Sequence, residues 1–229
     1  MSWDPTWFRA MLLVGIFAVG GCDRSPRGQA SLSDSVASQL NFIAGDIVKE
    51  GPIYELKFTP DGNRLAAASS GSELNLWKVD GLSERVIHSI PKPTAVGLTF
   101  LHDGRDIAFV AEEGGLYILS SIGWNETVAS DTQSWTAVAA SFDCAFLATG
   151  NVTNHDEILL LDTESLDRKK ILRGHRSFVV SVSFSPNRLI LVSGGFDDAA
   201  IVWNVETGEC LATLRHNSWV ESLAFSPDG

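Results

Sequence analysis

The sequence predicts an all-β fold built from repeated four-stranded antiparallel units, and three observations support this prediction. Phenylalanines recur at nearly constant intervals, a second apolar position follows the first four of them by 19 residues, and turn motifs recur between short apolar runs. Self-similarity at a fixed period of 20 to 50 residues is typical of repeat architectures in which each unit forms one supersecondary element.

The two registers set the length of the repeat. The first register comprises Phe58, Phe100, Phe142, Phe184 and Phe225, at intervals of 42, 42, 42 and 41 residues. The second comprises Trp77, Leu119, Leu161 and Trp203, at intervals of 42 residues throughout. A local pattern, apolar-x-x-apolar-x-Phe, precedes each phenylalanine, and in the third copy it is read as Ala137, Ala140 and Phe142. Both registers together predict one structural unit per 42 residues.

Each copy contains four short strands with turn signals between them. In the first copy a strand ends at Phe58, the turn 59–62 (TPDG) follows, and apolar runs come at 65–69, 74–79 and 85–90. Pro and Asp-Gly favour tight turns at such positions. Four strands per repeat predict one blade of a β-propeller, since radial stacking buries both faces of each sheet.

The repeats occupy residues 43–229 and amount to about four and a half blades. The sequence ends at Ser226-Pro-Asp-Gly, in the middle of a predicted blade. The closed propellers that are commonest have about 4–8 blades. We therefore expect a C-terminally truncated, incomplete ring, whose total blade number the sequence leaves open.

The fourth copy resembles a WD-repeat β-propeller. It carries Gly174-His175, a Ser-Phe-Ser-Pro turn, Ser193-Gly194-Gly195, Asp197, and Trp203 six residues later. The resemblance implies a hydrogen-bonded structural tetrad across the blade, formed by His175, Ser193, Asp197 and Trp203. Such a network is physically reasonable, because a carboxylate fixes the imidazole tautomer and a buried indole N–H needs an acceptor.

Other copies depart from this pattern. The fourth copy has Trp203-Asn204 where the family has Trp-Asp, and the fifth has Arg215-His216 where Gly-His is usual. Gly71, Glu113 and His155 stand at the Asp position of copies one to three. These three copies are therefore expected to be held mainly by apolar packing.

The N-terminal segment is typical of a targeting signal. Residues 1–21 contain a 12-residue apolar stretch, too short for a membrane-spanning helix, and Val19-Gly20-Gly21-Cys22 resembles a bacterial lipobox. The resemblance implies cleavage before Cys22 and lipid attachment to it. Residues 22–42 then read as a lipidated cysteine and flexible tether. The predicted location is a membrane, on its periplasmic side, and Asp23 favours the inner membrane. An uncleaved N-terminus with an incidental cysteine remains the alternative.

Charge and cysteine content exclude several classes of protein. Lys plus Arg is 17 and Asp plus Glu is 28, so the formal net charge is −11. A nucleic-acid backbone is disfavoured as a partner, because that binding is driven by Lys and Arg displacing counterions. Three cysteines do not make a disulfide scaffold, and Cys144 and Cys210 are expected to be buried, unpaired thiols.

No catalytic, metal-binding or cofactor-binding motif is present. The sequence lacks HExxH, CxxC, GxSxG, a phosphate-binding GxxxxGK[ST] loop and a dinucleotide fingerprint. The acidic pair Glu112-Glu113 is more typical of a solvated turn than of a cation site. The sequence therefore predicts a non-enzymatic protein without catalytic residues, metal or cofactor, and indicates no small-molecule substrate.

The predicted site is a partner-binding rim at one end of the blades. In the resembled family, the loops before the first strand and between the second and third strands share this rim. Aromatic residues and Arg, which are enriched in interface hot spots, occur there. The candidate rim residues are Tyr54, Trp135, Arg176, Phe178, Phe196, Asp198 and Trp219.

The leading interpretation is a membrane-tethered, non-enzymatic WD-repeat scaffold that binds an unidentified protein partner. One alternative is a channel-site enzyme, a hydrolase or quinoprotein-like protein, whose ligands lie in missing blades. A second is a propeller lipoprotein subunit of an envelope-assembly machinery, and a third is a sensor domain of a larger protein. The second of these alternatives rests on analogy of fold alone.

Overall fold

The computed structural model describes only part of the chain. The described residues are 53–69, 73–78, 85–89, 94–112, 114–120, 126–130, 135–151, 156–187, 189–226 and 228–229. The predicted signal 1–21, the lipid-attachment residue Cys22 and the predicted tether 22–42 lie outside them.

The described strands form four antiparallel sheets of four strands each, and each sheet follows chain order. The first contains β1 (Ile53–Phe58), β2 (Arg64–Ser69), β3 (Glu73–Lys78) and β4 (Arg85–Ser89). The second contains β5 (Ala95–Leu101), β6 (Asp106–Ala111), β7 (Leu116–Ser120) and β8 (Glu126–Ser130), with a 3-10 turn η3 (His102–Gly104) after β5. The third contains β9 (Trp135–Ala140), β10 (Phe146–Asn151), β11 (Glu157–Asp162) and β12 (Arg168–Arg173). The fourth contains β13 (Val179–Phe184), β14 (Ile190–Gly195), β15 (Ala199–Asn204) and β16 (Cys210–Arg215).

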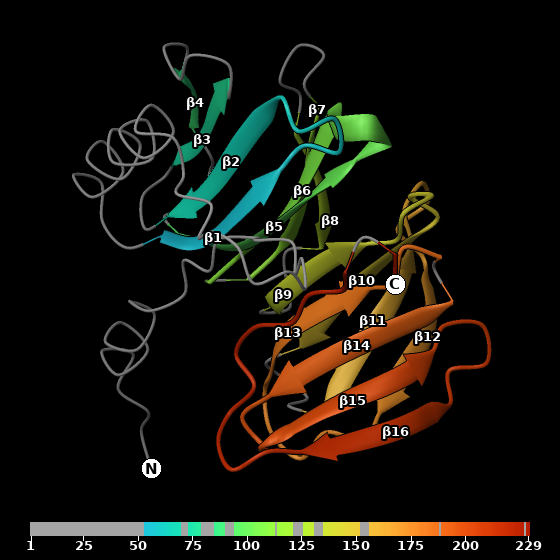
Figure 1. Cartoon of the computed structure of the whole chain (residues 1–229). Helices are drawn as coiled ribbons and strands as arrows, with labels where there is room; N and C mark the ends of the chain where they lie inside the picture. The colour runs from blue at the N-terminus through green and yellow to red at the C-terminus, as the bar shows by residue number, and fades with distance from the viewer. Residues whose placement is uncertain are drawn as a thin grey trace, which may run out of the picture.

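The four sheets stack in chain order through their first strands. β1 contacts β5, β5 contacts β9, and β9 contacts β13. The sheets therefore fan out like blades, with β4, β8, β12 and β16 as outer strands (Figure 1). The described sheets do not close into a ring. This confirms the predicted fold class, an all-β incomplete propeller of four-stranded antiparallel blades.

Apolar side chains between neighbouring sheets form the core. One cluster joins the third and fourth sheets and includes Ile158, Leu172, Phe184 and Trp203. Equivalent clusters lie between the first and second sheets and between the second and third. Burial of apolar surface between blades is the main stabilising contribution, at about 25 cal/mol per Å² removed from water. This packing holds the rim loops on a rigid support.

One register of the sequence analysis is wrong in the third copy. Phe58 and Phe184 end their strands, and Phe100 is the last but one residue of β5; the three pair with Leu65, Leu191 and Ile107. In the third sheet the equivalent residue is Ala140, which pairs with Leu147. Phe142 lies in the following turn and is 79% exposed. Its 42-residue spacing does not reflect structural equivalence.

Two compensating length changes explain this error. The interval from Phe100 to Ala140 is 40 residues, while the interval from Ala140 to Leu161 is 21 rather than 19. The connection into the third sheet is thus two residues shorter, and the connection between β10 and β11 is two residues longer. The second register, by contrast, is confirmed: Trp77, Leu119, Leu161 and Trp203 pair with equivalent residues of the second strands.

The segment after β16 begins a fifth inner strand without a sheet of its own. Val220 is buried, and its N–H donates to the carbonyl of Gly195 at 3.1 Å. A Cβ on Gly194 would lie 2.6 Å from Val220 atoms, as a Cβ on Gly150 would lie 2.5 Å from Val179. Val220 therefore contacts the fourth sheet in the way that Val179 contacts the third. Within the described part of 216–229 no strand pairing is formed.

Candidate partner-binding rim

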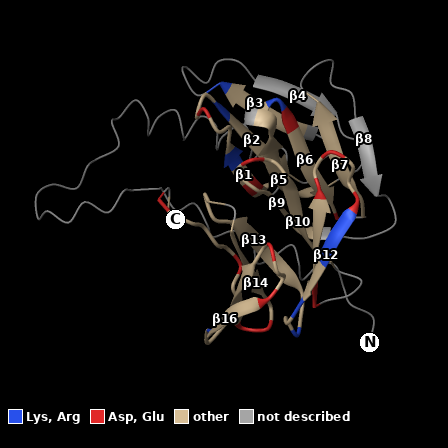
Figure 2. Cartoon of the chain, turned by 90° about the vertical axis from the view of Figure 1, so that its right-hand side faces the viewer, with Lys and Arg blue, Asp and Glu red and all other residues tan. Residues whose placement is uncertain are grey.

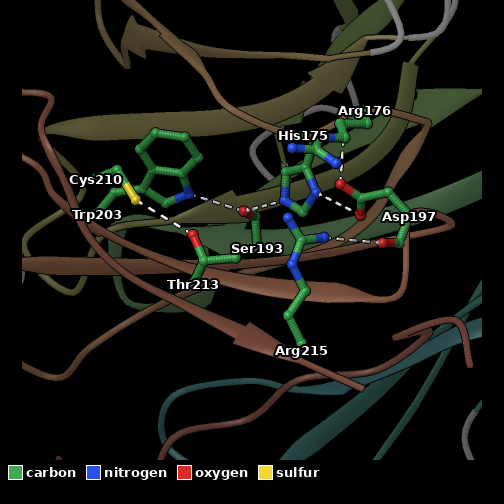
Figure 3. Close-up of polar contacts among 8 residues, drawn as sticks. All are labelled: His175, Arg176, Ser193, Asp197, Trp203, Cys210, Thr213 and Arg215. Atoms are coloured by element: carbon green, nitrogen blue, oxygen red, sulfur yellow. Dashed lines mark hydrogen bonds and ion pairs between the residues drawn. The ribbon is translucent and has the colours of Figure 1, made fainter. Parts of the chain in front are cut away.

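A chain of buried hydrogen bonds crosses the fourth sheet. Trp203 Nε1 donates to Ser193 Oγ at 2.8 Å, and Ser193 Oγ lies 2.7 Å from His175 Nε2. His175 Nδ1 lies 2.9 Å from Asp197 Oδ1. An ionised carboxylate only accepts, so Nδ1 carries the proton and Nε2 accepts from the Ser193 hydroxyl. The structure thus brings the four predicted tetrad residues into one continuous network (Figure 3).

The network ends at the turn between β14 and β15. Asp197 Oδ2 accepts from the backbone N–H of Arg176 at 2.8 Å, and Arg215 Nη1 donates to the Asp197 carbonyl at 3.4 Å. The Phe196 N–H donates to the Phe178 carbonyl at 2.9 Å, and the His216 N–H donates to the Asp198 carbonyl at 2.8 Å. Asp197 therefore connects this turn to the loop before β13. The bonds of Arg215 and His216 connect the same turn to the end of β16.

Three aromatic rings gather where these loops meet, and we call Phe178, Phe196 and Trp219 the rim cluster. Phe178 and Phe196 are in edge contact, with ring centroids 6.3 Å apart and planes at 74°. Phe196 and Trp219 lie closer, with centroids 4.6 Å apart and planes at 33°. Edge-to-face and offset arrangements are favourable aromatic geometries. Trp219 contacts Phe196 but remains 43% exposed, so part of the cluster is accessible to solvent.

The other predicted rim residues do not all join this cluster. Arg176 is exposed beside it, and Asp198 lies in the same turn with φ of 58°. Tyr54 lies on β1 of the first sheet, which the second and third sheets separate from the cluster. Trp135 begins β9, and its side chain lies outside the described part of the structure.

Two residues of the site were missed by sequence reasoning. Arg215 and His216 stand where the family pattern has Gly-His, and the sequence analysis treated them only as a departure. In the structure they anchor the end of β16 to Asp197 and Asp198. Ala199 pairs with Arg215, which places the end of β16 beside the turn that carries Asp197 and Asp198.

The two cysteines in the described part of the chain, Cys144 and Cys210, are free, and Figure 3 shows Cys210 near the network. Cys210 is exposed at the start of β16, and its Sγ lies 3.7 Å from Thr213 Oγ1. The prediction that Cys210 is buried is therefore wrong, because β16 is an outer strand without a neighbouring sheet. Cys144 is half-buried and accepts the His102 backbone N–H at 3.2 Å.

One carboxylate with a perturbed pKa lies between the first two sheets. Glu55 on β1 accepts the Leu98 N–H of β5 at 2.8 Å and pairs with Lys57 at 3.1 Å. Burial raises the pKa of Glu55, while Lys57 and the Leu98 N–H act in the opposite direction. Burial disfavours the charged form of a carboxyl group. Glu55 is thus a junction residue between blades, remote from the rim cluster.

The described residues offer no clustered metal ligands. No group of three His, Cys, Asp or Glu side chains with the arrangement of a metal site occurs among them. In the same part of the chain, no helix has the length and apolar character needed to span a membrane.

Comparison with known sequences identifies WD40 repeats in the chain. The family model described as "WD domain, G-beta repeat" matches residues 40–78, 166–204 and 208–229. Residues 79–165, which the family model does not match, contain the second sheet and β9, β10 and β11 of the third, and both sheets have the same four-stranded antiparallel topology.

Curated relatives share this character. Protein hir-1 of Neurospora crassa is 26% identical over 78% of the chain and 16% of its own length. Polyadenylation factor subunit 2 of the same species is 26% identical over 84% of the chain and 29% of its own length. Eukaryotic translation initiation factor 3 subunit I of Aspergillus terreus is 37% identical over 29% of the chain and 20% of its own length. The chain thus spans less than a third of these relatives.

The comparisons overturn the predicted location. The sequence analysis placed the protein on the periplasmic side of a membrane through a lipid on Cys22. The relatives are eukaryotic proteins, among them translation initiation and polyadenylation factor subunits, and not membrane lipoproteins. A short apolar stretch before a cysteine is a weak signal, and because Asp4 offsets Arg9, residues 1–9 lack the positive charge of a secretory leader.

Proposed function

We propose that this chain is a non-catalytic WD40-repeat scaffold that binds a protein partner through the rim cluster of its fourth sheet. The observation that carries the proposal is the tilted contact of Phe196 with Trp219, which is 43% exposed, while hydrogen bonds hold the turn that carries Phe196. Large aromatic residues on a rigid support are the typical anchors of protein interfaces.

The physical argument concerns conformational entropy. Binding costs free energy when loops and side chains must be ordered at the interface. Asp197 and the backbone bonds of Phe196 already hold the turn, and the ring contacts restrict the aromatic side chains. A preorganised aromatic surface therefore binds with a smaller ordering cost than a mobile loop of the same composition.

The relatives support the same class of function. Two of them are named as subunits, one of a polyadenylation factor and one of a translation initiation factor. A subunit works by contact with other proteins, and repeat folds provide extended surfaces for such contacts. The chain covers only part of these relatives, so its own partner is to be found by experiment.

The test compares co-purifying proteins for three versions of the full chain. The wild type, the double variant Phe196→Ala/Trp219→Ala and the control Phe142→Ala are expressed in the native host and analysed by quantitative mass spectrometry. Phe142 is a matched control, because it is an exposed aromatic in the turn after β9, at the opposite end of the strands.

We expect at least one protein to be depleted more than about tenfold in the double variant and retained in the control, since hot-spot truncation typically costs 2 kcal/mol or more. Identical sets of proteins for all three versions, with all three shown to be folded, would overturn the proposed function.

A further inference from the structure

We infer that the rim cluster binds a basic segment of its partner, one that presents Arg or Lys side chains to the exposed indole of Trp219. This inference rests on the proposed function and names the chemistry of the partner. It follows from the geometry of the two rings and from the charges that surround them.

The ring geometry leaves an aromatic face available. Trp219 packs on Phe196 with centroids 4.6 Å apart, yet 43% of the residue is exposed. Contact on one side thus leaves indole surface open to solvent. The face of Trp is the best partner for a Lys ammonium or an Arg guanidinium, because the ring quadrupole is negative there.

The charges around the cluster have an excess of carboxylates. Asp198 and Glu221 stand beside the cluster in sequence, together with Asp197, whose side chain is almost fully buried, against the guanidinium groups of Arg176 and Arg215. One of the two guanidinium groups, that of Arg215, donates to the Asp197 carbonyl. A positively charged segment thus meets a net negative local field.

The charge of the whole molecule acts in the same direction. The chain carries a net charge of −11, four of its 17 Lys and Arg residues lie on β12 (RKKILR), and Figure 2 shows acidic residues at the loops of the fourth sheet. Lys169 on β12 pairs with Asp162, and Arg173 pairs with Glu157. A negative surface potential accelerates encounter with a basic partner and slows encounter with an acidic one.

The experiment uses short peptides that differ only in charge. Acetyl-GRGRG-amide, its citrulline counterpart and its glutamate counterpart are titrated into the ¹⁵N-labelled full chain. The readout is the indole N–H resonance of Trp219, assigned by its loss in Trp219→Phe. Citrulline has the shape of arginine without its charge, so the first two peptides isolate the contribution of the cation.

We expect saturable shifts with the arginine peptide, binding about two- to fivefold weaker with citrulline, and the weakest binding with glutamate, as for a cation–π contact at an exposed site. Phe196→Ala should weaken arginine binding, while Phe142→Ala should not. Equal binding of arginine and citrulline, preference for glutamate, or absence of arginine binding overturns the inference. These results leave the scaffold proposal standing, because they do not measure binding of the partner protein itself, as the co-purification experiment does.

Discussion

Asp197 joins the buried interior of the fourth sheet to its rim, because one carboxylate oxygen lies 2.9 Å from His175 Nδ1 while the other accepts the Arg176 N–H at 2.8 Å. The His175 side chain is fully buried, and that of Asp197 is nearly so. Charge-assisted hydrogen bonds of this kind are stronger than neutral ones. The position of the rim turn therefore depends on a residue inside the sheet.

Removal of the Asp197 carboxylate should destabilise the protein. Asp197→Ala leaves His175 Nδ1 and the Arg176 N–H without their acceptor, at a cost of about 1–3 kcal/mol. The free energy of unfolding from chemical denaturation measures this cost. Asp198→Asn serves as control, because Asn tolerates the positive φ of that position. Equal stabilities of the two variants would show that the network contributes nothing.

The network should behave as one unit. Ser193→Ala removes the acceptor of Trp203 Nε1 and the partner of His175 Nε2. Because both variants damage the same network, the double variant Ser193→Ala/Asp197→Ala should cost less than the sum of the single variants, with a coupling of about 0.5–3 kcal/mol. A double-mutant cycle of unfolding free energies measures this coupling. Strict additivity would mean that His175 does not connect the two residues.

Two glycines at equivalent positions should differ in their tolerance of a methyl group. In Gly150→Ala the new Cβ meets the carbonyl of Val179, which β13 holds in a paired sheet. In Gly194→Ala it meets Val220, whose segment has no partner strand. Overpacking typically costs about 1–3 kcal/mol, so the Gly150→Ala variant should be clearly less stable than the Gly194→Ala variant. A larger loss for Gly194→Ala, measured by thermal unfolding, would contradict this interpretation of the fifth inner strand.

The blade junction at Glu55 should show a pH-dependent stability. Burial raises the pKa of Glu55, so the folded state favours its protonated form. The stabilising contribution of protonated Glu55 is then fully present below the unfolded-state pKa of this group, and it is lost as pH rises through the folded-state pKa. Glu55→Gln keeps an acceptor for the Leu98 N–H and removes the charge.

Glu55→Gln should therefore have a higher melting temperature than the wild type at about pH 7, and the difference should shrink at about pH 4. The Lys57→Gln variant measures the effect of the ion pair separately from the effect of burial, because it removes the cation and leaves the charge of Glu55. A lower melting temperature of Glu55→Gln at neutral pH would mean that the Lys57 pair outweighs the burial of the carboxylate.

The corrected register of the third repeat makes a further prediction. Phe184 is buried between the third and fourth sheets, whereas Phe142 is exposed in a turn. Phe184→Ala should cost about 3–5 kcal/mol in unfolding free energy, and Phe142→Ala should be close to neutral. Comparable losses of stability for both variants would support the equivalence of Phe142 and Phe184 that the 42-residue spacing alone suggests.

The fold could be predicted from the sequence because strand pairing and packing repeat together. The Trp203 register lies in the buried third strands, where one lost residue would expose a large side chain. Trp77 and Trp203, both almost fully buried, hold the same place in the first and fourth sheets. Loops between sheets and between strands carry no such constraint, which is why the Phe142 alignment failed.

A second signal in the sequence would have corrected that alignment. Thr59, Ser141 and Ser185 each donate a side-chain hydroxyl to the Asp or Asn two residues later. The same hydroxyls accept the N–H five residues on. This turn places Ser141, and hence Ala140, at the end of its strand.

The candidate site was less predictable than the fold. The family pattern indicated which residues of the fourth repeat could form the network, but ring contacts such as Phe196 with Trp219 depend on loop conformation. The first and third repeats lack that pattern, so nothing in the sequence distinguished Tyr54 from the aromatic residues of the cluster. The N-terminal prediction failed for a different reason, because a short apolar stretch is compatible with many contexts.

Site-specific photo-crosslinking tests the central claim most directly. A benzophenone amino acid replaces Trp219 in one version of the full chain and Phe142 in another, and both are irradiated in the native host. We predict a discrete crosslinked protein at position 219, the same protein that co-purification loses in Phe196→Ala/Trp219→Ala, and none of it at position 142. The same crosslinks at both positions, or none at position 219, would contradict a partner-binding rim on the fourth sheet.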